Sequence, residues 1–319
     1  MDSKNTREIG YRTVNIFAPE RFIYFFADAP HLMKTARNCL SLSAPGVGKR
    51  YLWRDGKHLL WQHIANLYYT DLENGGKAVS KLSVDHIKLN SYSRMTVKFA
   101  AQVLSESVSI NLKLWDKTEE SSETAEYCGL MDKFFDCFNV RYKEGSKPSN
   151  GPKKTKKALK PWLKSYKSLD DERLFWLENT FLNYFKTWEK NVQNRPGKFT
   201  KTERARMFIS RPTYEGLLIS VYSLIEVIPY LLNQGFDYIL SERFCQDILE
   251  EYFGDHRRKG GRADNPDVQT FGSQTAALMM QKKVTCHTGN TKGRHDHKKT
   301  WEVVSDEPLP KLKSKRKQQ

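Results

Sequence analysis

The sequence predicts a mostly helical protein with a small α/β portion near its N-terminus. One short run of β-branched and aromatic residues, 21–26 (RFIYFF), has the composition of a buried strand. From Leu59 onward the apolar residues recur at helical spacing instead, most clearly between Tyr127 and Phe138. No later run shows the alternation of apolar and polar residues that a further sheet needs. We therefore expect one strand followed by many helices.

Composition narrows the class of partner. The chain has 319 residues, of which 39% are apolar and 12% aromatic, so it can build sizeable cores. Its formal net charge of +16 favours a polyanionic partner, most commonly nucleic acid. The five cysteines form no C-x-x-C pair, which favours a reducing compartment. The most apolar segment, 216–232, is interrupted by Glu226 and Pro229 and reads as too short to span a bilayer, so we expect no membrane partner.

Asp28 lies between the predicted strand and a predicted helix at residues 31–40. In open α/β sheets, ligands gather at the carboxyl ends of strands, which makes this carboxylate a candidate for binding. The alternative is a plain helix N-cap, with Pro30 near the first helical position. The residues alone leave both roles open.

Residues 241–261 (SERFCQDILEEYFGDHRRKGG) combine an amphipathic helix with a Phe-Gly break and a basic end. Asp247 and Glu250 lie three apart, so both carboxylates occupy one helix face, where a metal ion or a donor-rich ligand can offset their repulsion. The alternative is an ordinary surface helix whose charges suit its dipole. The cations that follow can receive phosphates: Arg257, Arg258, Lys259 and Arg262.

A lysine-rich stretch, residues 143–167, changes composition sharply and reads as an exposed loop. It can contact the DNA backbone, serve as a nuclear import signal, or be a solvated basic loop. A second basic stretch, 291–319, reads as a disordered tail. The lysines of the loop that are candidates for DNA contact are Lys153, Lys154, Lys156 and Lys157.

Three segments resemble the P element transposase family, including its THAP-domain relatives. The first is FFADAPHLMKTARNCL. The second comprises KLSVDHI, MTVKFAAQVLSESV and TAEYCGLMDKFFDCFN. The third is SERFCQDILEEYFGDHRRKGGRADNPDVQTFG. Their order and spacing agree with the family over nearly the whole chain.

The resemblance implies a ribonuclease H-like core interrupted by a large, mostly helical insertion that binds GTP. It places a partial core at residues 1–42, the insertion at 43–210 and returning core helices at 211–290. The family cuts and joins DNA at transposon ends in the nucleus, using an acidic trio that holds two Mg²⁺ ions. Asp28 matches its second catalytic aspartate, and Glu250 matches its catalytic glutamate, so both are expected to bind metal.

The resemblance also implies nucleotide-binding residues. Phe135, Asp136 and Asn139 match the run that reads guanine, and Asp247 is expected to face the nucleotide. In this family GTP serves assembly and DNA positioning. Without the resemblance, Phe135 reads as core and Asp136 as a surface charge. The matched phosphate and nucleotide contacts are Lys81, Val97 and Ser105.

Some family features have no counterpart in this sequence. None of the 27 residues before Asp28 provides the first catalytic aspartate, and the family's zinc-binding domain and dimerising coil are not recognisable. We therefore expect a fragment or domesticated copy that is deficient in cutting DNA. It would bind GTP and transposon-end DNA, with a second copy or the full-length transposase as a further partner. The alternatives are a non-catalytic, repressor-like protein that binds GTP and DNA, and a basic helical scaffold whose matched acids are structural.

Overall fold

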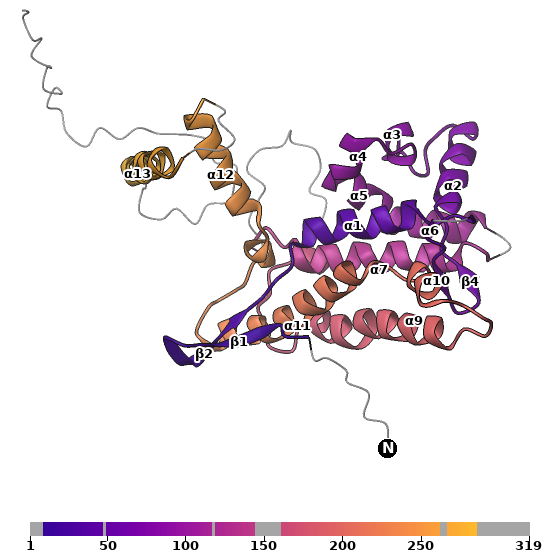
Figure 1. The fold of residues 1–319 in the computed structure, drawn as a ribbon, viewed down its shortest axis with the longest axis horizontal. Helices are drawn as coiled ribbons and strands as arrows, with labels where there is room; N and C mark the ends of the chain where they lie inside the picture. Colours follow the sequence, from indigo (N-terminus) through magenta and orange to yellow (C-terminus); the bar gives the residue numbers. More distant parts are fainter. Residues whose placement is uncertain (1–8, 47–48, 117–118, 144–160, 262–266, 286–319) are drawn as a thin grey trace, which may run out of the picture. The chain divides into compact units, whose positions relative to one another are not determined.

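A computed structural model describes residues 9–46, 49–116, 119–143, 161–261 and 267–285. Helices dominate these ranges, as the sequence predicts (Figure 1). The elements are β1 (Arg12–Asn15), β2 (Ala18–Tyr24), α1 (Ala29–Ser41), β3 (Trp53–Arg54), β4 (Lys57–His58), α2 (Trp61–Glu73), α3 (Val84–Ile87), α4 (Ser91–Met95), α5 (Val97–Val103), α6 (Glu106–Trp115), α7 (Ser122–Phe138), η1 (Pro161–Leu163), α8 (Glu172–Trp176), η2 (Leu177–Phe181), α9 (Leu182–Asn194), α10 (Lys201–Arg206), α11 (Arg211–Asn233), η3 (Ser241–Phe244), α12 (Asp247–Lys259) and α13 (Val268–Thr285).

The strands of the described residues form two antiparallel hairpins, β1–β2 and β3–β4. The expectation of a buried strand at residues 21–26 is wrong. β2 ends at Tyr24, and its side chains Phe22 and Ile23 are 44% and 45% exposed. A two-stranded ribbon has no further strand or second layer to cover both faces, so apolar composition alone does not bury it.

α1 confirms the predicted helix at residues 31–40 and extends it by a few residues at its ends. Pro30 lies in its first turn, where a missing N–H costs nothing. Leu32, Met33, Ala36 and Leu40 are buried at helical spacing and face the core. The sequence therefore sets both the start and the inner face of this helix.

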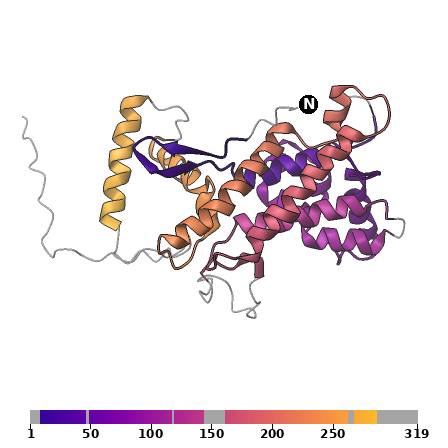
Figure 2. The same cartoon turned by 90° about the horizontal axis from the view of Figure 1, so that it is seen from below.

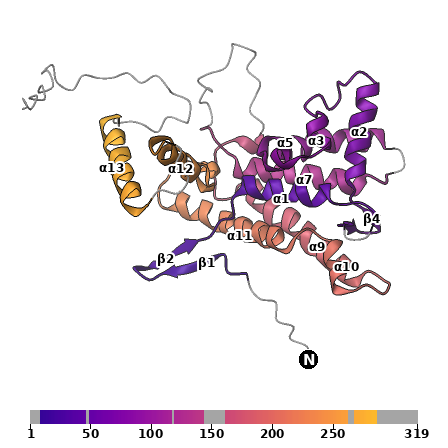
Figure 3. The same ribbon diagram turned by 45° about the horizontal axis from the view of Figure 1, so that its top comes forward.

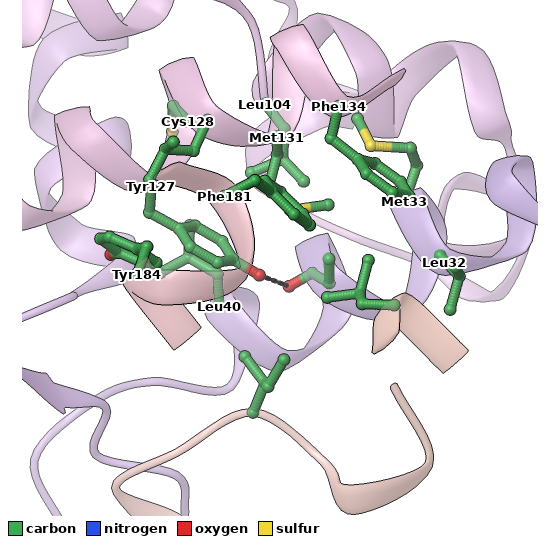
Figure 4. Close-up of a cluster of buried hydrophobic side chains, with 14 of the residues drawn as sticks. Leu32, Met33, Leu40, Leu104, Tyr127, Cys128, Met131, Phe134, Phe181 and Tyr184 are labelled. Carbon is green, nitrogen blue, oxygen red and sulfur yellow. Dashed lines mark hydrogen bonds between the residues drawn. The ribbon is translucent and has the colours of Figure 1, made fainter. Parts of the chain in front are cut away.

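α7 packs against α6, α1 and η2, and α1 also packs directly against α11 (Figure 1). The apolar side chains of α7 are buried as predicted, with Phe134 stacked on Phe181 of η2 at 4.8 Å between ring centroids. The Tyr127 hydroxyl donates to the carbonyl oxygen of Ala36 at 3.3 Å (Figure 4). Burying each large apolar side chain contributes roughly 1.5–3 kcal/mol, so this stripe contributes to the stability of the core.

The predicted helix around residues 174–188 runs from α8 through a π turn, η2, into α9. Phe181, Leu182 and Phe185 are all fully buried. The π turn adds a residue to one turn and so keeps these side chains on the core side. Figure 2 shows α9 running alongside α11.

α11 is longer than the apolar segment predicted there, because it begins at Arg211 and continues through Pro229. By length and apolar composition it is long enough to cross a membrane, with a mean hydropathy of 1.5 over an 18-residue window, so the expectation that it is too short is wrong. Half of that window is buried inside the protein. A Cβ at Gly216 would lie 2.8 Å from Leu32 Cδ2, so this glycine allows α11 to approach α1 closely.

The chain divides into two compact units. The first contains residues 1–146 and 155–248, and one continuous core joins its helices. The second contains residues 147–154 and 249–319. The second unit contains most of α12 and all of α13 (Figure 3). His256 of α12 is buried and stacks on Phe271 of α13, with ring centroids 4.6 Å apart.

The expected Phe-Gly break in residues 241–261 is wrong. α12 continues through Phe253 and Gly254 to Lys259. An interior glycine costs a helix about 1 kcal/mol relative to alanine, which weakens the helix without ending it. Phe244 lies before α12, in the 3₁₀ turn η3.

Candidate functional site

A cavity of about 360 Å³ lies among α5, α6, α7 and the loop before α3. It brings together two of the residues matched to nucleotide binding, Lys81 and Ser105. Five further polar residues line its wall and were not predicted: Lys98, Gln102, Glu106, Ser107 and Asp132. A second cavity of about 150 Å³ is also lined by Lys81 and Gln102, so the hollow extends toward the loop before α3.

The N-terminus of α6 opens at this cavity. Ser105 is the N-cap: its hydroxyl donates to the carbonyl oxygen of Gln102 at 2.9 Å and accepts from the backbone N–H of Val108 at 3.4 Å. The side-chain oxygen of Gln102 lies 2.9 Å from Nε2 of His86, which fixes its orientation. Two ammonium groups, from Lys81 and Lys98, therefore stand near the positive end of a ten-residue helix, where an anion is stabilised.

The other residues matched to nucleotide binding are not among those lining the cavity. Phe135 and Asp136 lie one helical turn beyond Asp132 on α7, and Phe135 packs partly against the core. Asn139 is the C-cap of α7, and its side-chain oxygen accepts from Nε of Arg141 at 2.8 Å. Val97 begins α5 and is half-buried.

Two spacings in the sequence indicate the missed residues. Lys98 follows a matched residue, Val97, directly, and Asp132 precedes a matched residue, Asp136, by four positions, which places both acids on one helix face. These residues line one cavity because α5, α6 and α7 pack together. A local sequence pattern does not predict that packing.

Asp28 joins two segments that are far apart in the chain. It is 8% exposed and caps α1, with Oδ2 accepting from the backbone N–H of His31 at 3.1 Å. Its Oδ1 accepts from the backbone N–H of Gln246, 218 positions later, at 2.9 Å. The ring of Phe26 stacks on that of Phe244 at 4.8 Å between centroids, beside this contact. The segment that leads into α12 is therefore fixed against the start of α1.

Asp247 belongs to the same neighbourhood. Burial raises the pKa of the Cys245 thiol to about 12, and the negative charges of Asp28 and Asp247 act in the same direction. Both carboxylates therefore lie close enough to the sulfur to disfavour a thiolate. Cys245 is accordingly a neutral neighbour of two acids.

The described residues do not make up a metal site. No group of three or more His, Cys, Asp or Glu side chains within these ranges could hold an ion. Both oxygens of Asp28 already accept backbone N–H bonds. Glu250 belongs to the second unit, and its pairing with Asp28 stays a prediction.

The predicted DNA contacts are described in part. Arg257, Arg258 and Lys259 are exposed in the last turn of α12, and the guanidinium of Arg258 pairs with Asp255. They form a small cationic surface at the end of a helix. The other predicted contacts lie outside the described residues: Lys153, Lys154, Lys156, Lys157 and Arg262.

Comparison with known proteins gives a matching family model for part of the chain. Residues 30–152 match the family described as TNP-like, GTP-binding insertion domain, and the cavity lies within this range. The chain is 28% identical over 254 residues to the transposable element P transposase of Drosophila melanogaster, covering 78% of this chain and 29% of that protein.

A solved structure shares the fold. It is the Drosophila P element transposase strand transfer complex, with a TM-score of 0.61, 24% sequence identity, and coverage of 85% of this chain and 54% of that chain. The match extends well beyond the range of the GTP-binding insertion domain. Residues 30–152 thus match a GTP-binding insertion domain family, and most of the chain is similar in sequence and fold to P element transposase.

Proposed function

We propose that this chain is a transposase-related protein that binds GTP in its helical insertion and binds DNA through its basic surface. The observation that carries the proposal is the cavity of about 360 Å³ between α5, α6 and α7. Its two lysines lie at a helix N-terminus, within the range matched to a GTP-binding insertion domain.

Each wall of the cavity suits one part of the nucleotide. Lys81 and Lys98 neutralise phosphate oxygens, and the first backbone N–H groups of α6 add donors. Asp132 offers a carboxylate that can accept from the guanine N1–H and N2 amine, which adenine cannot satisfy. The predicted guanine readers Phe135 and Asp136 come one turn later on α7 and are proposed to contact the base as the nucleotide extends from the cavity.

DNA cutting is the less supported activity. A partial ribonuclease H-like core around α1 and α12, with Asp28 and Glu250 as metal ligands, remains a proposal from the resemblance. The described donors do not fit a resident pair of Mg²⁺ ions, since no group of three acidic, histidine or cysteine ligands occurs within the described residues. A Mg²⁺-dependent cleavage assay on terminal-repeat DNA tests this: robust cutting that Asp28→Asn and Glu250→Gln both abolish would establish the catalytic role instead.

Calorimetry with GTP and ATP tests the nucleotide proposal. We expect a preference for GTP, and a loss of about tenfold to a hundredfold in affinity for Lys81→Ala or Lys98→Ala, because a charge-assisted contact contributes about 1.5–3 kcal/mol. Asp132→Asn should lower the affinity for GTP more than it lowers the affinity for ATP. Lys190→Ala, an exposed lysine on α9, is the matched control and should bind like the parent. Equal binding of GTP and ATP, or parent-like affinity in both lysine variants, would overturn the proposal.

A further inference from the structure

Another cavity lies elsewhere in the first unit, between α2 and the end of α6. Its volume is about 730 Å³, which is within the range of small-molecule sites. One wall is a single face of α2 that includes His63, Thr70 and Asn74. The opposite wall contains Trp115 and Asp116, where α6 ends. None of these residues contributes to the nucleotide cavity.

The electrostatics of this cavity oppose those of the protein as a whole. Two carboxylates, Asp116 and Glu120, line it, and no lysine or arginine is among its described lining residues. Asn74 and Asp116 are the C-caps of α2 and α6, so the negative ends of two helix dipoles lie at the cavity. In a chain of net charge +16, the charged residues among the described lining are acidic, which disfavours phosphate there.

The charges of the two carboxylates affect the pKa of His63 in the cavity wall. Burial lowers the pKa of His63, and the charges of Asp116 and Glu120 act in the opposite direction. Nδ1 of His63 lies 2.9 Å from the Thr124 hydroxyl, which fixes the ring in the wall. Oδ2 of Asp116 accepts from the backbone N–H of Ser121 at 2.5 Å, which holds that carboxylate in place.

The remaining lining is apolar and aromatic. Leu67, Leu112 and Leu114 supply an aliphatic surface, and Trp115, 36% exposed, supplies an indole ring. An indole face and a nearby carboxylate together stabilise an organic cation, while the leucines favour an apolar stem. A bare metal ion would use neither of these surfaces.

We propose that this cavity binds an organic cation, an ammonium or guanidinium group carried on an apolar stem. The same chemistry occurs on a free polyamine and on a lysine or arginine side chain of a peptide. The cation meets Asp116 and Glu120, and the stem lies against Trp115 and the leucines. This site is independent of the nucleotide cavity.

Calorimetry with three probes tests the assignment: the capped peptide acetyl-Leu-Lys-Leu-amide, the same peptide with an Nζ-acetylated lysine, and spermidine. We expect the cationic peptide to bind at least tenfold more tightly than its acetylated form, because only the charge differs. Binding of spermidine without binding of the peptide would also support the site and would identify a free amine as the source.

Variants localise the binding. Asp116→Asn with Glu120→Gln should weaken the cation at least tenfold, while the asparagine oxygen can still accept from Ser121. The matched control is Asp170→Asn with Asp237→Asn, which removes the same charge from exposed positions outside the cavity. Lys81→Ala should leave the cation unaffected and so separates this site from the nucleotide cavity. No binding of either cation, equal binding of the acetylated peptide, or an equal loss in the control pair would overturn the proposal.

Discussion

The carboxylate of Asp28 accepts one backbone N–H bond from each of two segments. One bond caps α1 through His31, and the other holds Gln246 in front of α12. A helix cap contributes about 0.5–2 kcal/mol, and a hydrogen bond to a charged acceptor contributes about 1.5–3 kcal/mol. The residue matched to a catalytic aspartate therefore has a structural role that can be measured without any substrate.

Replacing Asp28 tests this structural role. We expect Asp28→Ala to lower the free energy of unfolding by roughly 1–3 kcal/mol, because both acceptors are lost. Asp28→Asn retains one acceptor and should lose about half as much. Urea unfolding measures both, with Asp85→Asn, at an exposed position in α3, as the control. Parent-like stability of Asp28→Ala would show that the two bonds are dispensable.

Two histidines make stability depend on pH. Burial lowers the pKa of His58 and of His63 below the ordinary value of 6.5. The unfolded chain therefore binds protons more readily than the folded one below about pH 6.5, and their contribution to stability is lost as the pH falls through that range.

Unfolding at about pH 7.5 and about pH 5.5 checks this expectation. The protein should lose stability on acidification, and a variant carrying His58→Asn and His63→Asn should lose less. Gln62→Asn, at an exposed position next to His63, should match the parent. The expectation is contradicted if the double variant shows the same pH dependence as the parent.

At the scale of elements, α11 fastens the N-terminal hairpin to the helices. The hydroxyl of Ser220 accepts from the N–H of Ala27 at 2.9 Å and donates to its carbonyl at 3.0 Å. Ser223 donates to the carbonyl oxygen of Phe25 at 2.6 Å. One turn earlier on the same helix, Gly216 lies where a Cβ would be 3.2 Å from the Cβ of Ala27. The segment leading into Asp28 is thus positioned by small and polar residues of α11.

A pair of glycine substitutions tests this contact. We expect Gly216→Ala to destabilise the protein by about 1–3 kcal/mol, because the added methyl group overlaps Leu32 and Ala27. Gly254→Ala is the matched control, since this helical glycine of α12 has nothing within 4 Å of an added Cβ. It should be neutral or stabilise by up to about 1 kcal/mol. Equal shifts in urea midpoint for the two variants would contradict the close approach.

Local patterns were sufficient where one element determines the outcome. The Asp-x-Pro start of α1 and the apolar stripe of α7 follow from capping and periodicity, and both are present. The burial of β2 was predicted wrongly, because burial depends on the layers that pack against a strand and a short sequence segment does not specify them. The break at Gly254 was predicted wrongly, because a helix can tolerate an interior glycine. Lys98 and Asp132 join Lys81 only through the packing of three helices, so the cavity itself could not be predicted.

At the scale of the whole molecule, the net positive charge is the property that most strongly indicates an anionic partner. The formal net charge is +16, and the exposed cations of α12 belong to the second unit. Binding of a basic protein to DNA releases counterions, so affinity falls with salt by about 0.9 in log–log slope per phosphate neutralised. The number of contacts can therefore be counted from salt dependence.

Changing Arg257, Arg258 and Lys259 together to glutamine should reduce that slope by about 2 to 3, if each meets a phosphate. Fluorescence anisotropy with a labelled duplex across a salt series measures it. The control changes three exposed lysines of the first unit, Lys190, Lys198 and Lys201, to glutamine and so removes the same charge. An identical fall in slope for both triples would assign binding to overall charge rather than to α12.

The bond between Asp28 and Gln246 has a consequence for how such a chain can change over evolution. Because these two positions are hydrogen-bonded, the long stretch between them begins and ends at the same place in the structure. Insertions in the surface turns of that stretch, outside the continuous core, can leave this contact in place. A module can therefore acquire a new ligand while the scaffold that carries it keeps its geometry.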